Sequence, residues 1–141
     1  MDIHEIAERC IGYWEAREWF EAFEKLYSND AVNVEPTNWH DRASVVAGKE
    51  AIIEKYRWVT EQLLIEHSIK CSEPYFFGGD RFIVSMENEV TPRQTGKRIR
   101  FTEVGLYTVK DGRVIKEEFF YSRKQMDMFG HLNELAAESG R

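Results

Sequence analysis

The sequence predicts one α+β domain in which a strongly curved antiparallel sheet wraps around N-terminal helices and forms a cone with a pocket at its open end. Three observations lead to this fold. Apolar residues recur at helical spacing over residues 3–28 and again over residues 48–64. From residue 65 onward the period changes to two, as expected for half-buried strands, and short turns join these stretches. The length of 141 residues is sufficient for one such domain.

The N-terminal half is predicted to hold helices and one short strand. Residues 3–28 carry two apolar stripes, and the charged residues 15–18 between them are a candidate bend whose position the sequence leaves open. Residues 31–35 alternate and end at a proline, which predicts a short strand, and residues 36–47 have no period, which predicts a loop. In the helix after this loop, we expect the charged residues to lie largely in solvent: Lys49, Glu50, Glu54, Lys55 and Arg57.

Four long strands joined by hairpins are predicted over residues 65–77, 81–90, 97–109 and 113–122. On the second of them, Glu87 and Glu89 share a face, which we interpret as a charged row with Arg98 or Arg100 across the strand pair. After the sheet, residues 124–139 fit a short helix.

The composition argues against several classes of function. Nineteen basic residues against 25 acidic ones give a net charge of −6, so we expect no nucleic-acid partner. The chain lacks an apolar stretch of the roughly 20 residues that a membrane span needs, and its start lacks a signal-peptide pattern, so we expect no membrane partner and a cytoplasmic location. Two reduced cysteines, four histidines without ligand spacing and the absence of nucleotide motifs predict neither a metal nor a cofactor.

Three segments carry a resemblance to a known superfamily: LYSNDAVNVEP at residues 26–36, GKEAI at residues 48–52, and TVKDGRVI at residues 108–115 with the aromatic strand after it. In this order they resemble the nuclear-transport-factor-2-like (NTF2-like) superfamily, which includes the SnoaL-like polyketide cyclases and the ketosteroid isomerases. The resemblance covers nearly the whole chain. It implies a single SnoaL-like domain over residues 1–141, with the cystatin-like cone fold.

The resemblance implies a catalytic role for Glu35. In the ketosteroid isomerases the matching position before a proline is an aspartate that shuttles a proton at carbon. A carboxylate partly desolvated at a pocket mouth has a raised pKa, which suits a general base near neutral pH. The alternative is a strand-end carboxylate in water.

The rest of the isomerase pattern is incomplete. Alignment with the family places Ile11 where the isomerases have a tyrosine, and Tyr13 reaches that place only after a shift of register. The final hairpin aligns Gly105 with the isomerase acid, and Glu103 lies two residues away on the same strand face. Glu103 is therefore a pocket acid or a buried structural hydrogen-bonding group. Tyr13 or Tyr121 is a further candidate to donate a proton or to stabilise an oxyanion by a hydrogen bond.

The same hairpin alignment turns one face of the last two strands toward the inside of the cone. It includes Ile115 and Glu117, and we interpret Glu117 as exposed or structural because it lies near a hairpin. The aromatic residues of the helices are explained first by core packing, but they also suit a pocket for a flat ligand. His40 lies in a loop and is a lid residue or simply exposed. The predicted pocket lining is Trp14, Trp39, His40, Tyr56, Phe101, Tyr107, Phe119 and Tyr121.

Two functions from different classes remain. The first is a cofactor-independent acid–base enzyme, an isomerase, cyclase, dehydratase or hydrolase, that acts on a hydrophobic carbonyl or polycyclic small molecule. The second is a non-catalytic ligand-binding or dimerisation module of the same fold. The resemblance also implies a homodimer through the outer sheet face, where Val104 and Leu106 are apolar but Arg98, Arg100 and Thr102 make the surface mixed.

Overall fold

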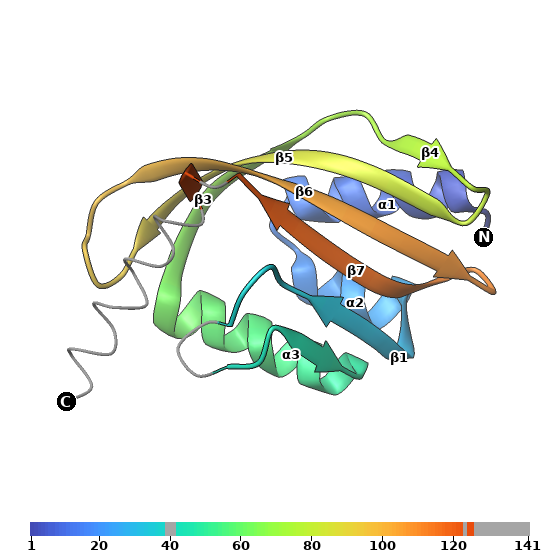
Figure 1. The fold of residues 1–141 in the computed structure, drawn as a ribbon, viewed down its shortest axis with the longest axis horizontal. Coiled ribbons are helices and arrows are strands. Elements are labelled where there is room, and N and C mark those ends of the chain that lie inside the picture. The colour runs from blue at the N-terminus through green and yellow to red at the C-terminus, as the bar shows by residue number, and fades with distance from the viewer. Residues whose placement is uncertain (39–41, 123, 126–141) are drawn as a thin grey trace.

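The computed structural model describes residues 1–38, 42–122 and 124–125, and it confirms the predicted α+β class (Figure 1). The predicted tail helix lies mostly outside the described residues. No helix in the described part is both long and apolar enough to span a membrane. The elements in chain order are α1 (Ile3–Glu15), α2 (Trp19–Leu26), β1 (Tyr27–Val34), β2 (Val45–Ala47), α3 (Lys49–Trp58), the π-helical turn η1 (Val59–Leu63), β3 (Leu64–Cys71), β4 (Tyr75–Phe77), β5 (Arg81–Pro92), β6 (Ile99–Lys110) and β7 (Arg113–Tyr121).

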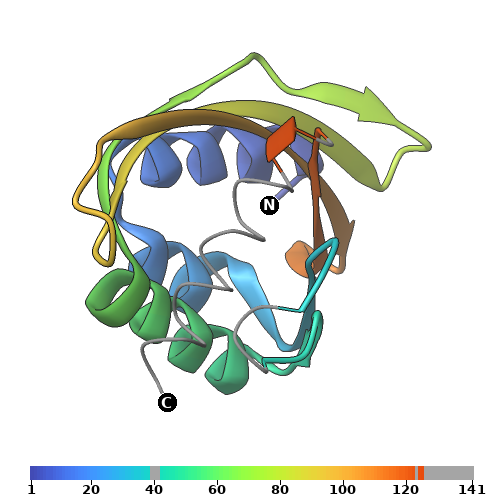
Figure 2. The same ribbon diagram turned by 60° about the vertical axis from the view of Figure 1, so that its left-hand side comes forward.

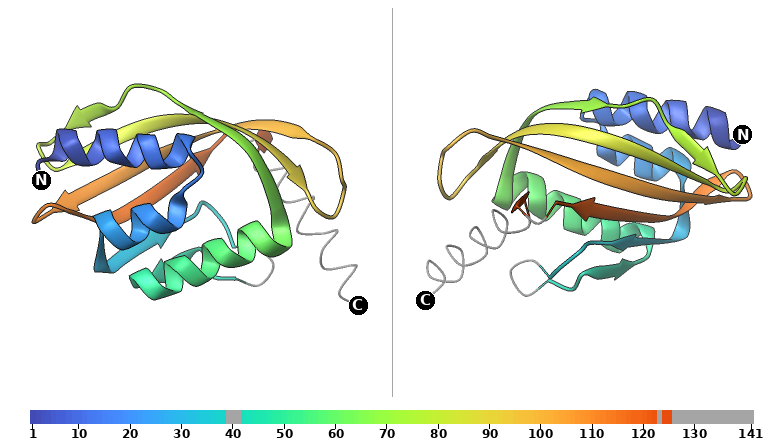
Figure 3. Two further views of the ribbon diagram at one scale, coloured as in Figure 1. Left: turned by 180° about the vertical axis from the view of Figure 1, so that it is seen from behind. Right: turned by 45° about the horizontal axis from the view of Figure 1, so that its top comes forward.

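The strands form one sheet of order β2-β1-β7-β6-β5-β3. The short strand β4 pairs with the first three residues of β5. As predicted, β5, β6 and β7 form an antiparallel meander. The first strand departs from the prediction of an antiparallel sheet, because β1 runs parallel to β7. The sheet curls around the helices, as the end-on view of Figure 2 shows, and the view from behind in Figure 3 shows all three helices on its concave side.

The sheet is held open by a helical segment rather than closed into a barrel. Helix α3 packs against β1 and β2 at one edge of the sheet. Its continuation η1 leads directly into β3, which is the other edge strand. The segment α3–η1 therefore lies across the opening between the two edges, and the space between it and the sheet is where a pocket can form.

The two N-terminal helices are separated where the charged stretch indicated. Arg17 has a φ of 57°, a left-handed conformation that ends α1 and turns the chain into α2. Helix α1 buries Ile6, Ala7, Cys10 and Trp14 against the sheet. The second helix ends earlier than predicted, since Tyr27 already belongs to β1 with its ring fully buried in the core.

Irregularities in the strands explain two wrong predictions. The stretch predicted as one strand over residues 65–77 is divided into β3 and β4, with Pro74 in the connection, where its missing N–H cannot interrupt a ladder. The β6–β7 register shifts between Thr108 and Val109, a β-bulge that places Val114 in the core and leaves Ile115 only partly buried. Ile115 was predicted on the inner face because strict alternation ignores such a bulge.

The outer face of the sheet carries the predicted charged row. Glu89 forms ion pairs with Arg98 at 3.0 Å and Arg100 at 3.6 Å. Val104 and Leu106 are partly buried on this face, and Phe120 beside them is 49% exposed. The pairing of two subunits through this face stays a prediction.

A glycine on the inner face gives the first testable prediction. A Cβ on Gly105 would lie 2.7 Å from Cε2 and 2.9 Å from the hydroxyl of Tyr107, a side chain that is itself buried. We expect Gly105→Ala to lower the free energy of unfolding by about 1–3 kcal/mol through overpacking. Gly12 is the matched control, because nothing lies within 4 Å of its added Cβ, and Gly12→Ala in a helix should stabilise by roughly 0.4–1 kcal/mol. Urea denaturation measures both, and a neutral Gly105→Ala would contradict the packing described.

Candidate functional site

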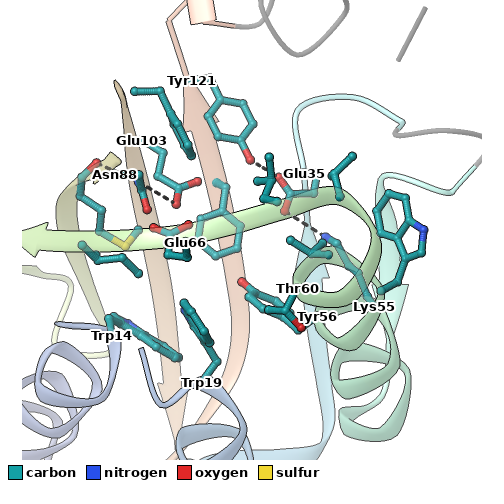
Figure 4. A pocket seen from close by; sticks show the side chains of 18 of the residues that line it. Trp14, Trp19, Glu35, Lys55, Tyr56, Thr60, Glu66, Asn88, Glu103 and Tyr121 are labelled. Atoms are coloured by element: carbon teal, nitrogen blue, oxygen red, sulfur yellow. Dashed lines mark hydrogen bonds and ion pairs between the residues drawn. The ribbon is translucent and has the colours of Figure 1, made fainter. Parts of the chain in front are cut away.

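A cavity of about 110 Å³ lies between the concave face of the sheet, the helices and η1 (Figure 4). A cavity that holds a single buried water needs about 10–15 Å³, so this one has room for a small organic molecule. Its wall is mainly apolar and aromatic, from Trp14, Trp19, Tyr56, Trp58, Val59, Leu63, Leu64, Ile69, Met86, Phe101, Tyr107, Phe119 and Tyr121. The polar residues in the wall are Glu35, Lys55, Thr60, Glu66, Asn88 and Glu103.

The structure brings most of the predicted site residues to this cavity. The two predicted acids line it with six of the predicted aromatic residues, which are Trp14, Tyr56, Phe101, Tyr107, Phe119 and Tyr121. Trp39 and His40 were also predicted to line it, but both lie outside the described residues.

Tyr13 is the exception among the described candidates. Cys10 and Trp14 point from α1 into the core, and the helical rotation of about 100° per residue turns Tyr13 to the side of this stripe. Its hydroxyl accepts a hydrogen bond from Arg9 at 3.5 Å, and the Lys25 ammonium lies 5.9 Å from its ring. Tyr13 is not in the wall of the cavity, so the structure does not bring it together with Glu35 and Glu103.

Glu35 follows β1 and is held by two donors from different elements. The Lys55 ammonium of α3 donates to Oε1 at 2.9 Å, and the Tyr121 hydroxyl of β7 donates to Oε2 at 2.6 Å. The Lys55 and Glu35 side chains are only 9% and 10% exposed. The prediction that Lys55 lies in solvent is therefore wrong, because the helix turns this cation inward to a buried carboxylate.

The ion pair continues into the core as a hydrogen-bonded chain. Lys55 also donates to the side-chain oxygen of Asn33, whose amide nitrogen donates to Glu117 at 2.5 Å. The Tyr27 hydroxyl donates to the other oxygen of Glu117. Burial raises the pKa of Glu117 to about 7, although these two hydrogen bonds oppose the shift. Glu117 is thus structural, and the alternative of an exposed residue is wrong.

Glu103 lies in the cavity in a very different environment. Its hydrogen-bond donor is the Asn88 amide, at 3.4 Å. Burial raises the pKa of Glu103 well above its usual range, and the nearby charges of Glu35 and Glu66 raise it further. This shift favours the protonated form of the Glu103 carboxyl, which is the form that can donate a hydrogen bond.

Glu66 is a functional candidate that the sequence reasoning missed. Burial raises its pKa to about 8, and its Oε1 atom is buried without a hydrogen-bond partner among the described residues. The β3–β5 register shifts between Glu66 and Ser68. In a regular strand, Glu66 would lie on the opposite face from the buried Ile69, because the two residues are three positions apart. The bulge inserts one extra residue between them, so Glu66 lies on the same inner face as Ile69. The alternation of Leu64, Ile65 and Glu66 before the bulge would have placed Glu66 on the same face as the buried Leu64.

The polar groups of the cavity are suited to proton transfer and hydrogen bonding. In the part of the chain that the structure describes, no group of three or more His, Cys, Asp or Glu side chains could hold a metal ion. The cavity combines a carboxylate at Glu35 that accepts two hydrogen bonds with two carboxyls, Glu103 and Glu66, whose pKa values are raised by burial. Two acids whose environments drive their protonation apart can serve as acid and base in one reaction.

Comparisons with known proteins agree with this architecture. Residues 1–121 match the family model described as SnoaL-like domain. A candidate SnoaL-like polyketide cyclase (carbohydrate phosphatase) from Mesorhizobium loti is 35% identical, with a TM-score of 0.78 over 86% of this chain and 100% of that chain. A cystatin-like protein of unknown function from Xanthomonas campestris is 16% identical, with a TM-score of 0.74 over 92% and 98% of the chains. TerC, co-crystallised with polyporic acid, is 19% identical, with a TM-score of 0.71 over 89% and 95%. No curated protein matches.

Proposed function

This chain belongs to the SnoaL-like domain family, as its sequence motifs indicated, and we propose that its cavity binds a hydrophobic small molecule with a carbonyl group and performs cofactor-independent acid–base chemistry on it. The observation that carries the proposal is the contrast between Glu35 and Glu103. One carboxylate accepts hydrogen bonds from Lys55 and Tyr121, and the other is buried with the weak donor Asn88.

The roles follow from these environments. A protonated Glu103 donates a hydrogen bond or a proton to the carbonyl oxygen of the substrate and stabilises the negative charge that develops there. Glu35 removes a proton from the neighbouring carbon, and Lys55 and Tyr121 hold the Glu35 side chain in place. The aromatic walls bind the apolar body of the substrate and exclude water. Such a proton transfer is the shared first step of an isomerisation, a cyclisation or a dehydration next to a carbonyl.

A second function, a non-catalytic binding module, is favoured by one observation. Both oxygens of Glu35 already accept hydrogen bonds, and the ion pair with Lys55 is nearly buried. A carboxylate whose two oxygens are both occupied by donors is less available to take a proton from a ligand, and the same cavity would then hold a ligand without changing it.

Proton exchange in a simple ketone distinguishes the two functions without knowledge of the natural substrate. Acetophenone in D₂O, followed by ¹H NMR, reports binding through shifts of its signals and base catalysis through loss of its methyl signal. We expect the wild type to accelerate the exchange, and Glu35→Gln and Glu103→Met each to reduce that acceleration by about 10²–10⁴-fold.

The control is Glu61→Gln, which changes an exposed carboxylate on η1 that is not part of the cavity wall. This variant should exchange at the wild-type rate. Binding of acetophenone without any accelerated exchange would overturn the enzymatic proposal and support the binding module.

A further inference from the structure

We propose that Glu66 recognises a protonated amine carried by the ligand, so that the cavity is selective for organic cations with an aromatic or aliphatic body. This inference rests on the proposed function only in taking the cavity as the ligand site. It adds a substrate class and a role for a carboxyl that the acid–base chemistry of Glu35 and Glu103 does not use.

The first argument is the hydrogen-bonding state of Glu66. Its Oε1 atom is buried in the cavity wall and has no partner among the described residues. A buried polar atom without a hydrogen bond costs about 1–3 kcal/mol. A ligand N–H group placed in the cavity would supply the missing donor, and Figure 4 shows the Glu66 and Glu103 carboxyls side by side, above the open space.

The second argument is the balance of charge around the cavity. Three carboxyls line it, one directly after β1 and the others on β3 and β6. The one cation in the wall, Lys55, is bound to Glu35 and Asn33. Arg17 lies near enough to Glu66 to lower its pKa, but its guanidinium is exposed and donates to the backbone oxygen of His67. Within the described residues, neither Glu66 nor Glu103 forms an ion pair. Once Glu66 has lost its proton it therefore has no counter-ion among these residues, and the ammonium group of a ligand would supply one.

The third argument is the aromatic wall opposite the carboxyls. Trp14, Trp19 and Tyr56 lie across the cavity from Glu66 and Glu103 (Figure 4). The face of an aromatic ring, and of tryptophan in particular, attracts a cation within about 6 Å and contributes about 0.5–2 kcal/mol. Aromatic faces on one side and acidic groups on the other form an environment complementary to an ammonium group attached to an apolar body.

Binding of the amine must release a proton. In the empty cavity Glu66 is mostly protonated at pH 7, because burial outweighs the attraction of Arg17 and its pKa is about 8. The other ionisable groups that line the cavity are Glu103, Glu35, Lys55 and the phenols of Tyr56, Tyr107 and Tyr121, and the exposed Arg17 acts on Glu66 from outside it. When the ammonium binds, the Glu66 carboxyl loses its proton to the buffer and becomes the counter-ion of the ligand. Affinity should therefore rise with pH, up to about tenfold per unit below pH 8.

The probes are benzylamine, which is protonated below pH 8.5, and benzyl alcohol, which has nearly the same shape and no charge. Titration calorimetry of the full chain at pH 7.5 should show benzylamine binding at least about tenfold more tightly, equivalent to ~1.4 kcal/mol. Measured in two buffers of different ionisation enthalpy, its binding at this pH should release roughly three-quarters of a proton, the fraction that a carboxyl with a pKa of about 8 still holds. Glu66→Gln should remove both the preference and the proton release, whereas Glu61→Gln should retain them.

Equal affinity for the two probes in the wild type, or binding of benzylamine without proton release, would overturn the proposal. Neither result depends on the Glu66 variant being folded. Both leave the proposed function intact, since that function is tested separately by ketone exchange. Conversely, selective binding of benzylamine with no exchange of acetophenone would establish the cation site in a non-catalytic module.

Discussion

Replacing Lys55 with methionine should lower the free energy of unfolding by about 3–5 kcal/mol, the loss typical when one partner of a buried ion pair is removed. The Lys55 ammonium contacts both Glu35 and Asn33, and its removal leaves a carboxylate and an amide oxygen unpaired in a nearly dry environment. Because whole domains are stable by only about 5–15 kcal/mol, this is a large fraction of the total.

Urea denaturation followed by circular dichroism measures the effect, with Lys25→Met as the control. Lys25 also pairs with a glutamate, Glu21, at 3.1 Å, but the side chains of both residues are more than half exposed. Lys25→Met should therefore change stability far less than Lys55→Met, because exposed ion pairs contribute little. The double variant Lys55→Met with Glu35→Gln should recover part of the loss, since it removes the unpaired charge. A loss below ~1 kcal/mol in Lys55→Met would show that this ion pair is solvated in solution.

Stability should fall as the pH rises from about 5 to 8, the reverse of the usual behaviour of carboxylates. Glu66 and Glu117 have pKa values raised from 4.5 to about 8 and about 7, and the pKa of Glu103 is also raised well above its usual range. Between pH 5 and 7 Glu66 and Glu117 hold more protons in the folded state than in the unfolded state, and the raised pKa of Glu103 acts in the same direction. Folding therefore binds protons, and each such group costs up to about 1.4 kcal/mol of stability per pH unit.

Urea midpoints measured between pH 5 and 8 test this slope. In the wild type the midpoint should be highest near pH 5 and decrease toward pH 8. Glu66→Gln removes one of the titrating groups, so its slope should be shallower, while the exposed Glu61→Gln should keep the wild-type slope. A midpoint that rises through this interval would mean that the three carboxyls are ionised in the folded protein.

The overall architecture could be predicted from the sequence because it depends on patterns that are strong and local. The helical stripes, the period of two after Leu64 and the hairpin turns correctly indicated most of the elements, and the alternation of Phe101, Glu103 and Tyr107 correctly indicated the inner face of β6. The pairing of β1 with β7 could not be read in this way. The alternation of residues within a strand shows which face is buried, but it does not show which distant strand lies beside it or in which direction that strand runs.

The site was predictable only in part, since two of its important residues depend on departures from regular geometry. Glu66 faces the cavity because a β-bulge changes the parity of β3. Lys55 was assigned to solvent because a lysine among charged neighbours normally lies there. Its burial makes sense only when Glu35, twenty residues earlier in the chain, is known to be beside it. Local patterns do not contain such tertiary pairs.

The position of β7 has a consequence for how the protein reaches its native state. This strand lies between β1 and β6 and joins, for example, Val32 to Lys116. During synthesis the first strand emerges long before its partner, and the edge it shares with β7 stays unpaired until translation has passed residue 121. Contacts of such long sequence separation slow folding and expose the nascent chain to aggregation. A ribosome-bound fragment that ends before β7 should consequently be protease-sensitive and dependent on chaperones, even though it already contains every helix described above.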